Sequence, residues 1–172
     1  MSRIPLAGRT LVLAALALSL AACDSTDDDW PFPGAEVDAE AGVEVTDAAA
    51  LAGLRAAWVA DRPDGYWLRY EVVCFCAPTV VDVRVVGDQI LETRLNGEVA
   101  PPERSLVVPL RVTDLYDQAI ASLDEAAFTE VRVRPGAPPL LVSLSIDGAF
   151  EIADDEVTYR VTAYAPLEVR AY

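Results

Sequence analysis

The sequence predicts an α+β domain in which two helices pack on an antiparallel sheet. Two segments carry apolar residues at the three- and four-residue spacing of a helix, and each is followed by three segments with the alternating pattern of strands. Turn signals such as Gly87-Asp88 and Asp147-Gly148 separate the strands. A chain of 172 residues supports one domain with a real core. Packing both helices on one face of the sheet buries these apolar faces together.

The first 22 residues have the zones of a secretory signal peptide. A basic start precedes the apolar run Leu11–Leu20, which is too short to span about 30 Å of hydrocarbon. The ending Leu20-Ala21-Ala22-Cys23 resembles a lipobox, where the lipoprotein signal peptidase cuts before a lipid-modified cysteine. We therefore expect residues 1–22 to be removed and Cys23 to be the lipidation site, so that acyl chains hold the chain on the extracytoplasmic side of a membrane. The alternative is ordinary secretion after Ala22, which leaves a free thiol.

Residues 23–45 are expected to form a lipidated acidic tether, because low hydrophobicity, an acid run and two prolines favour a solvated segment. Asp24 beside the cysteine resembles an inner-membrane retention signal, whereas the cluster over 25–29 resembles a surface-export signal. A periplasmic and a surface-facing placement in the cell envelope therefore both stay open. The stretch Trp30-Pro31-Phe32-Pro33 is either an inert spacer or a segment that docks on the domain or on an envelope partner.

We expect the folded domain, residues 46–172, to begin with a helix. Thr46 or Asp47 can cap this helix, and Pro63-Asp64-Gly65 ends it. Between them, apolar residues recur at helical spacing: Leu51, Leu54 and Trp58. Tyr66–Cys76 then alternates with the period of a strand whose even-numbered residues face the core. Strands over 79–86 and 89–95 follow.

A proline-rich crossover leads to the second half of the domain. Thr113 is predicted to cap a helix with one apolar side: Leu115, Ala119, Ile120, Leu123 and Ala127. Three strands are predicted after it, over 128–134, 140–146 and 157–164. The repeated order of one helix and three strands is a candidate tandem α-β-β-β duplication, although no residue-level repeat stands out. By fold analogy alone, such tandem repeats resemble small extracytoplasmic modules that include protease and β-lactamase inhibitors.

The composition argues against most catalytic and nucleic-acid-binding functions. The 13 basic residues, all Arg, and 28 acidic residues give a net charge of -15, which repels nucleic acid. The acidity either attracts cations or basic partners or is an adaptation for solubility. Without histidine or lysine, the common nucleophile pairs and the commonest metal ligand are missing. We therefore expect no enzyme, no cofactor and no metal site. The run Asp154-Asp155-Glu156 is read as a solvated turn rather than a calcium cage.

Two cysteines remain after the anchor, Cys74 and Cys76, in the stretch VVCFCAP. In an oxidising compartment they are expected to be oxidised, and a local disulfide is the favoured interpretation. Strand rise puts their Cα atoms about 6.6 Å apart, near the upper limit for a bridge, so a bulge or bend is needed. Buried free thiols, and redox or metal chemistry, are the alternatives. Against redox chemistry, no lysine or histidine lies nearby to stabilise a thiolate.

Two aromatic side chains, Trp67 and Phe75, fall on the outward side of the strand over 66–76. If both are exposed, they form an apolar patch that would suit a protein partner. Coverage by a helix or by the proline-rich crossover is the other interpretation.

A family resemblance supports the compartment and the single domain. Trp58, Arg62-Pro63, Tyr66, Tyr70 and Cys74-Phe75-Cys76 resemble a family of bacterial lipoproteins and secreted proteins filed as a domain of unknown function. The turn at Gly87-Asp88, the helix start Asp114-Leu115-Tyr116 and the segment Ile152–Val161 are also similar. The likeness covers roughly residues 46–165, and it implies no catalytic residue.

The function that we expect from these observations is that of a membrane-anchored, non-enzymatic binding or structural module of the cell envelope, with an envelope protein as its candidate partner. The alternatives are an inhibitor-like module acting on an extracytoplasmic enzyme and a Cys-x-Cys thiol-disulfide protein.

Overall fold

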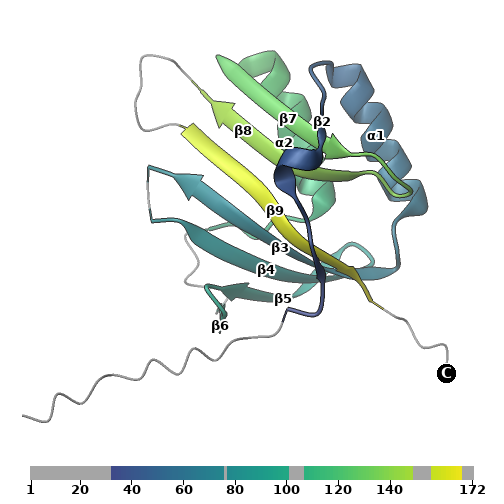
Figure 1. The fold of residues 1–172 in the computed structure, drawn as a ribbon, viewed down its shortest axis with the longest axis vertical. Helices are drawn as coiled ribbons and strands as arrows, with labels where there is room; N and C mark the ends of the chain where they lie inside the picture. The colour runs from purple at the N-terminus through teal and green to yellow at the C-terminus, as the bar shows by residue number, and fades with distance from the viewer. Residues whose placement is uncertain (1–31, 76, 101–106, 149–155, 168–172) are drawn as a thin grey trace, which may run out of the picture.

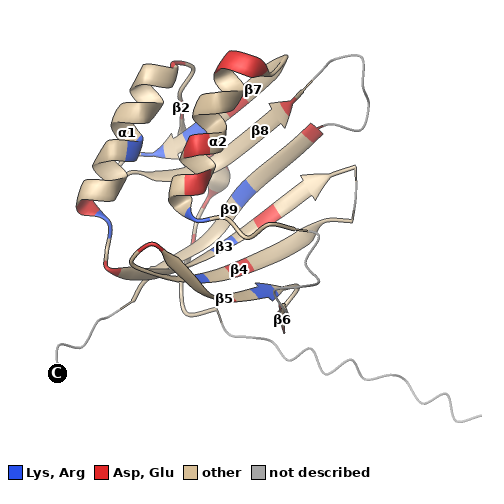
Figure 2. Cartoon of the chain, turned by 180° about the vertical axis from the view of Figure 1, so that it is seen from behind, with Lys and Arg blue, Asp and Glu red and all other residues tan. Residues whose placement is uncertain are grey.

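The computed structural model describes residues 32–75, 77–100, 107–148 and 156–167. These residues form one antiparallel sheet of nine strands with two helices on one face, so the predicted α+β fold is confirmed (Figure 1; Figure 2). The strand order is β2-β7-β8-β9-β3-β4-β5-β6, and β1 pairs with β9 beside this path. The expected lipid site Cys23, the leader, Cys76 and the acids Asp154 and Asp155 lie outside the described residues.

The first half of the domain follows the sequence prediction closely. Helix α1 spans Ala48–Asp61, and the Asp47 carboxylate accepts a hydrogen bond from the Ala50 backbone N–H at 2.7 Å, as expected of a cap. The strands that follow are β3 (Gly65–Cys74), β4 (Thr79–Val86), β5 (Gln89–Leu95) and β6 (Glu98–Val99). The turn between β4 and β5 needs Gly87 at φ 59°.

The second half has one helix followed by three strands, whereas the first half has the short fourth strand β6 in addition. The elements of the second half are α2 (Val112–Glu125), β7 (Phe128–Arg134), β8 (Leu140–Asp147) and β9 (Glu156–Pro166). The two halves meet where β9 pairs with β3. The structure does not test whether they arose by duplication, so the tandem repeat stays a prediction.

The predicted cap of α2 is wrong. Thr113 lies inside the helix and is buried, because the helix already begins at Val112. The capping group is Asp114, whose carboxylate accepts a hydrogen bond from the Arg111 backbone N–H at 2.8 Å. The side chain that accepts from the free Arg111 N–H therefore belongs to a residue in the first turn of the helix, and not to a residue before the helix.

The core lies between the helices and the sheet. Trp58, Tyr66 and Tyr70 are fully buried there, which confirms the inward direction predicted for the even-numbered residues at the start of β3. The tyrosine hydroxyls also fasten the segment before α2: Tyr70 accepts from the Leu110 N–H at 2.9 Å, and Tyr66 accepts from the Val112 N–H at 3.3 Å. Burial raises the pKa of Tyr66 to about 12.

The segment before α1 differs from the predicted tether. Residues 32–45, which we call the strap, cross the outer face of the sheet, opposite the helices (Figure 1). The strap contains β1 (Ala35–Glu36), the 3₁₀ turn η1 (Ala39–Ala41) and β2 (Val43–Glu44). β1 pairs with the end of β9 and β2 with β7. The sequence predicted that the folded part begins at Thr46. In the structure it begins earlier, because backbone pairing outweighs the polar composition of this segment.

Candidate functional site

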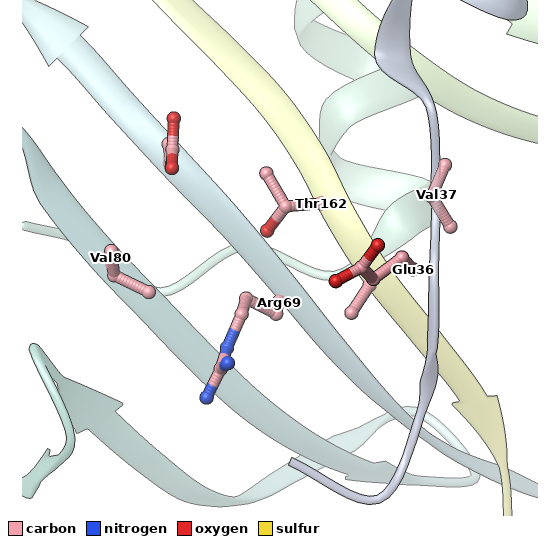
Figure 3. Close-up of a pocket in the computed structure, with 7 residues that line it drawn as sticks. Glu36, Val37, Arg69, Val80 and Thr162 are labelled. Carbon is pink, nitrogen blue, oxygen red and sulfur yellow. The ribbon is translucent and has the colours of Figure 1, made fainter. Parts of the chain in front are cut away.

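A groove on the outer face of the sheet is one candidate binding site. It lies between the strap and the strands β3, β4 and β9 and has a volume of about 410 Å³ (Figure 3). Its walls are formed by Glu36, Val37, Arg69, Glu71, Val80, Thr162 and Ala163.

A bulge in β9 shapes this groove. Arg69 pairs with Ala163 while Tyr70 pairs with Val161, so Thr162 has no opposite residue on β3. The Thr162 carbonyl accepts a hydrogen bond from the Val37 backbone N–H at 2.8 Å, which holds the strap at the groove. The bulge thus provides the attachment point for the segment that closes one side.

The charge of Arg69 is largely compensated by its neighbours. Its guanidinium donates to both carboxylate oxygens of Asp82, at 2.6 and 3.0 Å, and the Phe32 ring centre lies 4.7 Å from its Cζ. The hydrogen bonding of the guanidinium to the Asp82 carboxylate raises the pKa of Arg69. Glu36 and Glu71 have no ion-pair partner in the described part of the chain. The groove therefore favours a ligand that carries positive charge or hydrogen-bond donors.

The predicted partner surface is not formed as a joint patch. Phe75 is 79% exposed, but Trp67 is only 7% exposed. The Phe32 ring packs edge-on against Trp67, with ring centres 6.4 Å apart. The strap therefore covers Trp67, a role that the sequence prediction gave to a helix or to the crossover. Within the stretch at 30–33, Phe32 docks on the domain, which was one of the two interpretations of that stretch.

Cys74 lies at the end of β3 and is partly exposed. Because Cys76 lies outside the described residues, the pairing of these two cysteines stays a prediction.

A second cavity, which the sequence analysis missed, lies at the end of the domain where α1, the turn between β7 and β8, and the end of β9 meet. Its volume is about 540 Å³. We call it the terminal pocket, and it is lined by Trp58, Asp61, Pro63, Arg134, Pro135, Gly136, Ala137, Pro138, Leu140, Tyr164 and Pro166. These residues come from three separate segments of the chain, so no local motif could have revealed them. The proline run at 135–139 gave only a signal for a turn.

The comparison with known proteins gives one family. Residues 50–166 match the Family of unknown function (DUF6174). The chain belongs to this family. No curated protein and no solved structure matches the chain. The match confirms the coarse part of the predicted resemblance, a domain of unknown function over most of the chain. It does not test the lipoprotein character or the cysteine motif.

The two cavities relate differently to the DUF6174 region. All the lining residues of the terminal pocket lie within residues 50–166. The groove also needs Glu36 and Val37, which precede the matched region. The strap is thus an addition to the part of the chain that defines the family.

Two properties of the described residues bear on the site. These residues contain no group of three or more acidic or cysteine side chains placed to hold a metal ion. None of their helices is long and apolar enough to cross a membrane.

Proposed function

We propose that this DUF6174 protein is an envelope lipoprotein, anchored through Cys23, whose domain is a non-enzymatic binding module held close to the membrane. The observation that carries the proposal is the attachment of the strap to the sheet. Because strand pairing begins at Ala35 and Phe32 already packs on Trp67 and Arg69, only residues 24–31 separate the domain from the lipid site.

The length of this connector limits the position of the domain. Nine Cα–Cα steps from Cys23 to Phe32 cover at most about 30 Å at about 3.5 Å each. A free tether up to residue 45 would reach more than twice as far. The outer face, where the strap begins, would therefore stay near the membrane surface, and the groove beside Glu36 would meet partners that are themselves in the envelope.

The charge of the groove indicates the class of partner. Glu36 on β1 and Glu71 on β3 both line the groove, and the chain as a whole carries a net charge of -15. A basic segment of another envelope protein is the occupant that this electrostatic field favours.

The anchor is tested by the variant Cys23→Ser. We expect the native protein to partition with membranes and its N-terminal peptide to carry the mass of a lipid, whereas the variant should be found in the soluble fraction. A native protein that retains Met1, or that stays soluble and unmodified inside the cell, would refute the anchored state.

The binding role is tested by photo-crosslinking in intact cells. A photoreactive residue at Glu71 probes the groove, and one at Asp124, an exposed position on α2, is the matched control. We expect one defined partner from position 71 and none from position 124. Equal labelling at both positions would contradict a binding groove. Recovery of a protease or cell-wall enzyme would favour the inhibitor-like alternative.

A further inference from the structure

Two residues that line the terminal pocket carry a buried hydrogen-bond donor that lacks an acceptor within the described part of the chain. Neither the indole Nε1 of Trp58 nor the hydroxyl of Tyr164 has a hydrogen-bond partner among the residues that the structure describes, and Trp58 is fully buried. Buried polar atoms in proteins are nearly always hydrogen-bonded, so each of these two atoms calls for a partner. An indole N–H can only donate, so the missing partner of Trp58 is an acceptor.

The two rings that carry these donors belong to an aromatic cluster at the pocket. Trp58 packs edge-on against Tyr66 and Tyr164, with ring centres 5.6 and 5.9 Å apart. The Tyr66 hydroxyl accepts a hydrogen bond from the Val112 N–H, whereas no described residue forms a hydrogen bond with the polar atom of either of the other two rings. Both of these rings line the terminal pocket, and Tyr66 does not.

Arg134 adds a positive charge to the pocket, near the Tyr164 hydroxyl. It lines the same pocket and forms no ion pair with the residues that the structure describes. Burial raises the pKa of Tyr164 to about 12, and the nearby charge of Arg134 lowers it in part. The phenol is therefore protonated at neutral pH and can donate a hydrogen bond. The pocket thus combines three donors with walls made of proline rings.

We propose that the terminal pocket binds a ligand through a single carboxylate group, which pairs with Arg134 and accepts hydrogen bonds from Trp58 and Tyr164. The proline side chains at 63, 135 and 138 would contact the apolar body of the ligand. Asp61 on the rim and the acidity of the chain disfavour ligands with several negative charges. The carboxylate belongs either to a free organic acid or to the C-terminus of a peptide.

The site uses neither the lipid anchor nor the outer groove, so a test of this proposal does not depend on the proposed function. Trp58 Nε1 and the Tyr164 hydroxyl are shielded from bulk solvent. The carboxylate therefore reaches them only when the pocket wall adjusts, and the indole N–H signal of Trp58 reports directly on this contact.

The test is a titration followed by NMR of the full chain, purified as the cell exports it, held in detergent micelles and labelled with ¹⁵N at tryptophan. The probes are N-acetyl-leucine and a leucine-terminated tripeptide, each compared with its C-terminal amide. We expect saturable shifts of the Trp58 indole N–H signal, assigned with Trp58→Phe, from at least one acid and from neither amide. The acid that binds more tightly identifies the source of the carboxylate.

Three substitutions locate the site. Arg134→Gln and Tyr164→Phe should each weaken binding of the acid about tenfold, because each removes one charge-assisted contact. Arg160→Gln, an exposed arginine of β9 outside the pocket, should leave binding unchanged. No Trp58 shift up to the solubility limit of both acids, equal shifts from the amides, or an equal loss in Arg160→Gln would each overturn the proposal. The comparison of acid with amide is made on the native protein, so it holds even if Arg134→Gln or Tyr164→Phe impairs folding.

Discussion

Arg69 on β3 and Asp82 on β4 form a bidentate ion pair on the outer face of the sheet, the face opposite the helices. The Arg69 Nε and Nη2 atoms lie 2.6 and 3.0 Å from the two carboxylate oxygens, and the Asp82 side chain is only 1% exposed. A buried carboxylate on the side away from the core is uncommon, since ionised groups lose much hydration when buried. Its guanidinium partner also supports the ring of Phe32, so this pair joins the strap to the sheet.

We predict that Arg69→Met destabilises the domain by about 3 kcal/mol, because it leaves the Asp82 carboxylate buried without its principal partner. The double variant Arg69→Met with Asp82→Leu should recover most of this loss, since an apolar pair avoids the cost of burying charge. Urea denaturation monitored by circular dichroism measures both. A double variant no more stable than Arg69→Met would show that packing, rather than the unpaired charge, explains the loss.

The strap should be sensitive to single added methyl groups. A Cβ at Gly42 would lie 2.7 Å from Val142 Cγ2, and one at Gly34 would lie 2.8 Å from the Tyr164 carbonyl oxygen. Gly34→Ala and Gly42→Ala are therefore expected to displace the strap and lower stability by about 1 to 3 kcal/mol. The rate of amide hydrogen exchange at Val37 and Val45, whose N–H groups bond to β9 and β7, should increase in both variants.

Gly53→Ala is the matched control for these two variants. Gly53 lies within α1, and an added Cβ there has no atom within 4 Å. The substitution should raise stability by about 0.5 to 1 kcal/mol, because alanine favours a helix over glycine. If Gly34→Ala and Gly42→Ala behave like Gly53→Ala, the strap does not pack on the sheet as described.

The parts of the fold that the sequence predicted are those with strong local signals. The strands over 79–86, 89–95 and 128–134 match the structure at both ends, since alternation and glycine turns mark them. The strap was missed because its strands have only two residues each and carry no alternating pattern. Their pairing depends on strand edges that become available only after the sheet has formed, so the information is not local.

The candidate sites were less predictable than the fold. The groove needs a β-bulge at Thr162, and the terminal pocket brings Trp58 next to Tyr164, a residue more than 100 positions away. Trp58 was correctly read as a core residue from its helical spacing, but no pattern in the sequence shows that its Nε1 lacks an acceptor. Trp67 was read as outward-facing, which the register supports, although the strap that covers it was taken for a tether.

Asp114 should make the domain less stable in acid. Burial raises the pKa of this carboxyl, but its hydrogen bonds with the Arg111 side chain and backbone outweigh burial, so the net pKa is lowered. A group with a lowered pKa in the folded state stabilises the fold above its unfolded pKa, about 3.9, and loses that contribution as the pH falls through its folded pKa. At neutral pH, Asp114→Asn should cost about 1 kcal/mol through loss of the charged cap.

The difference in unfolding free energy between the native protein and Asp114→Asn should therefore be constant above about pH 5 and shrink toward pH 2. Denaturation at a series of pH values measures it. Asp124→Asn, at an exposed position in the last turn of the same helix, is the control and should leave the acid-dependent loss in place. A difference that does not depend on pH would exclude Asp114 as the source.

The pairing of Cys74 with Cys76 can be decided on the purified, unfolded protein. We expect neither cysteine to react with iodoacetamide before reduction and both to react afterwards. The double variant Cys74→Ala with Cys76→Ala should lose only about 1.5 kcal/mol, because a bridge between near neighbours restricts the unfolded chain little. The native protein should also fail to reduce insulin or to catalyse disulfide exchange. A free Cys74 thiol before reduction would disprove the bridge, and catalysed exchange that is lost in the double variant would instead establish a redox function.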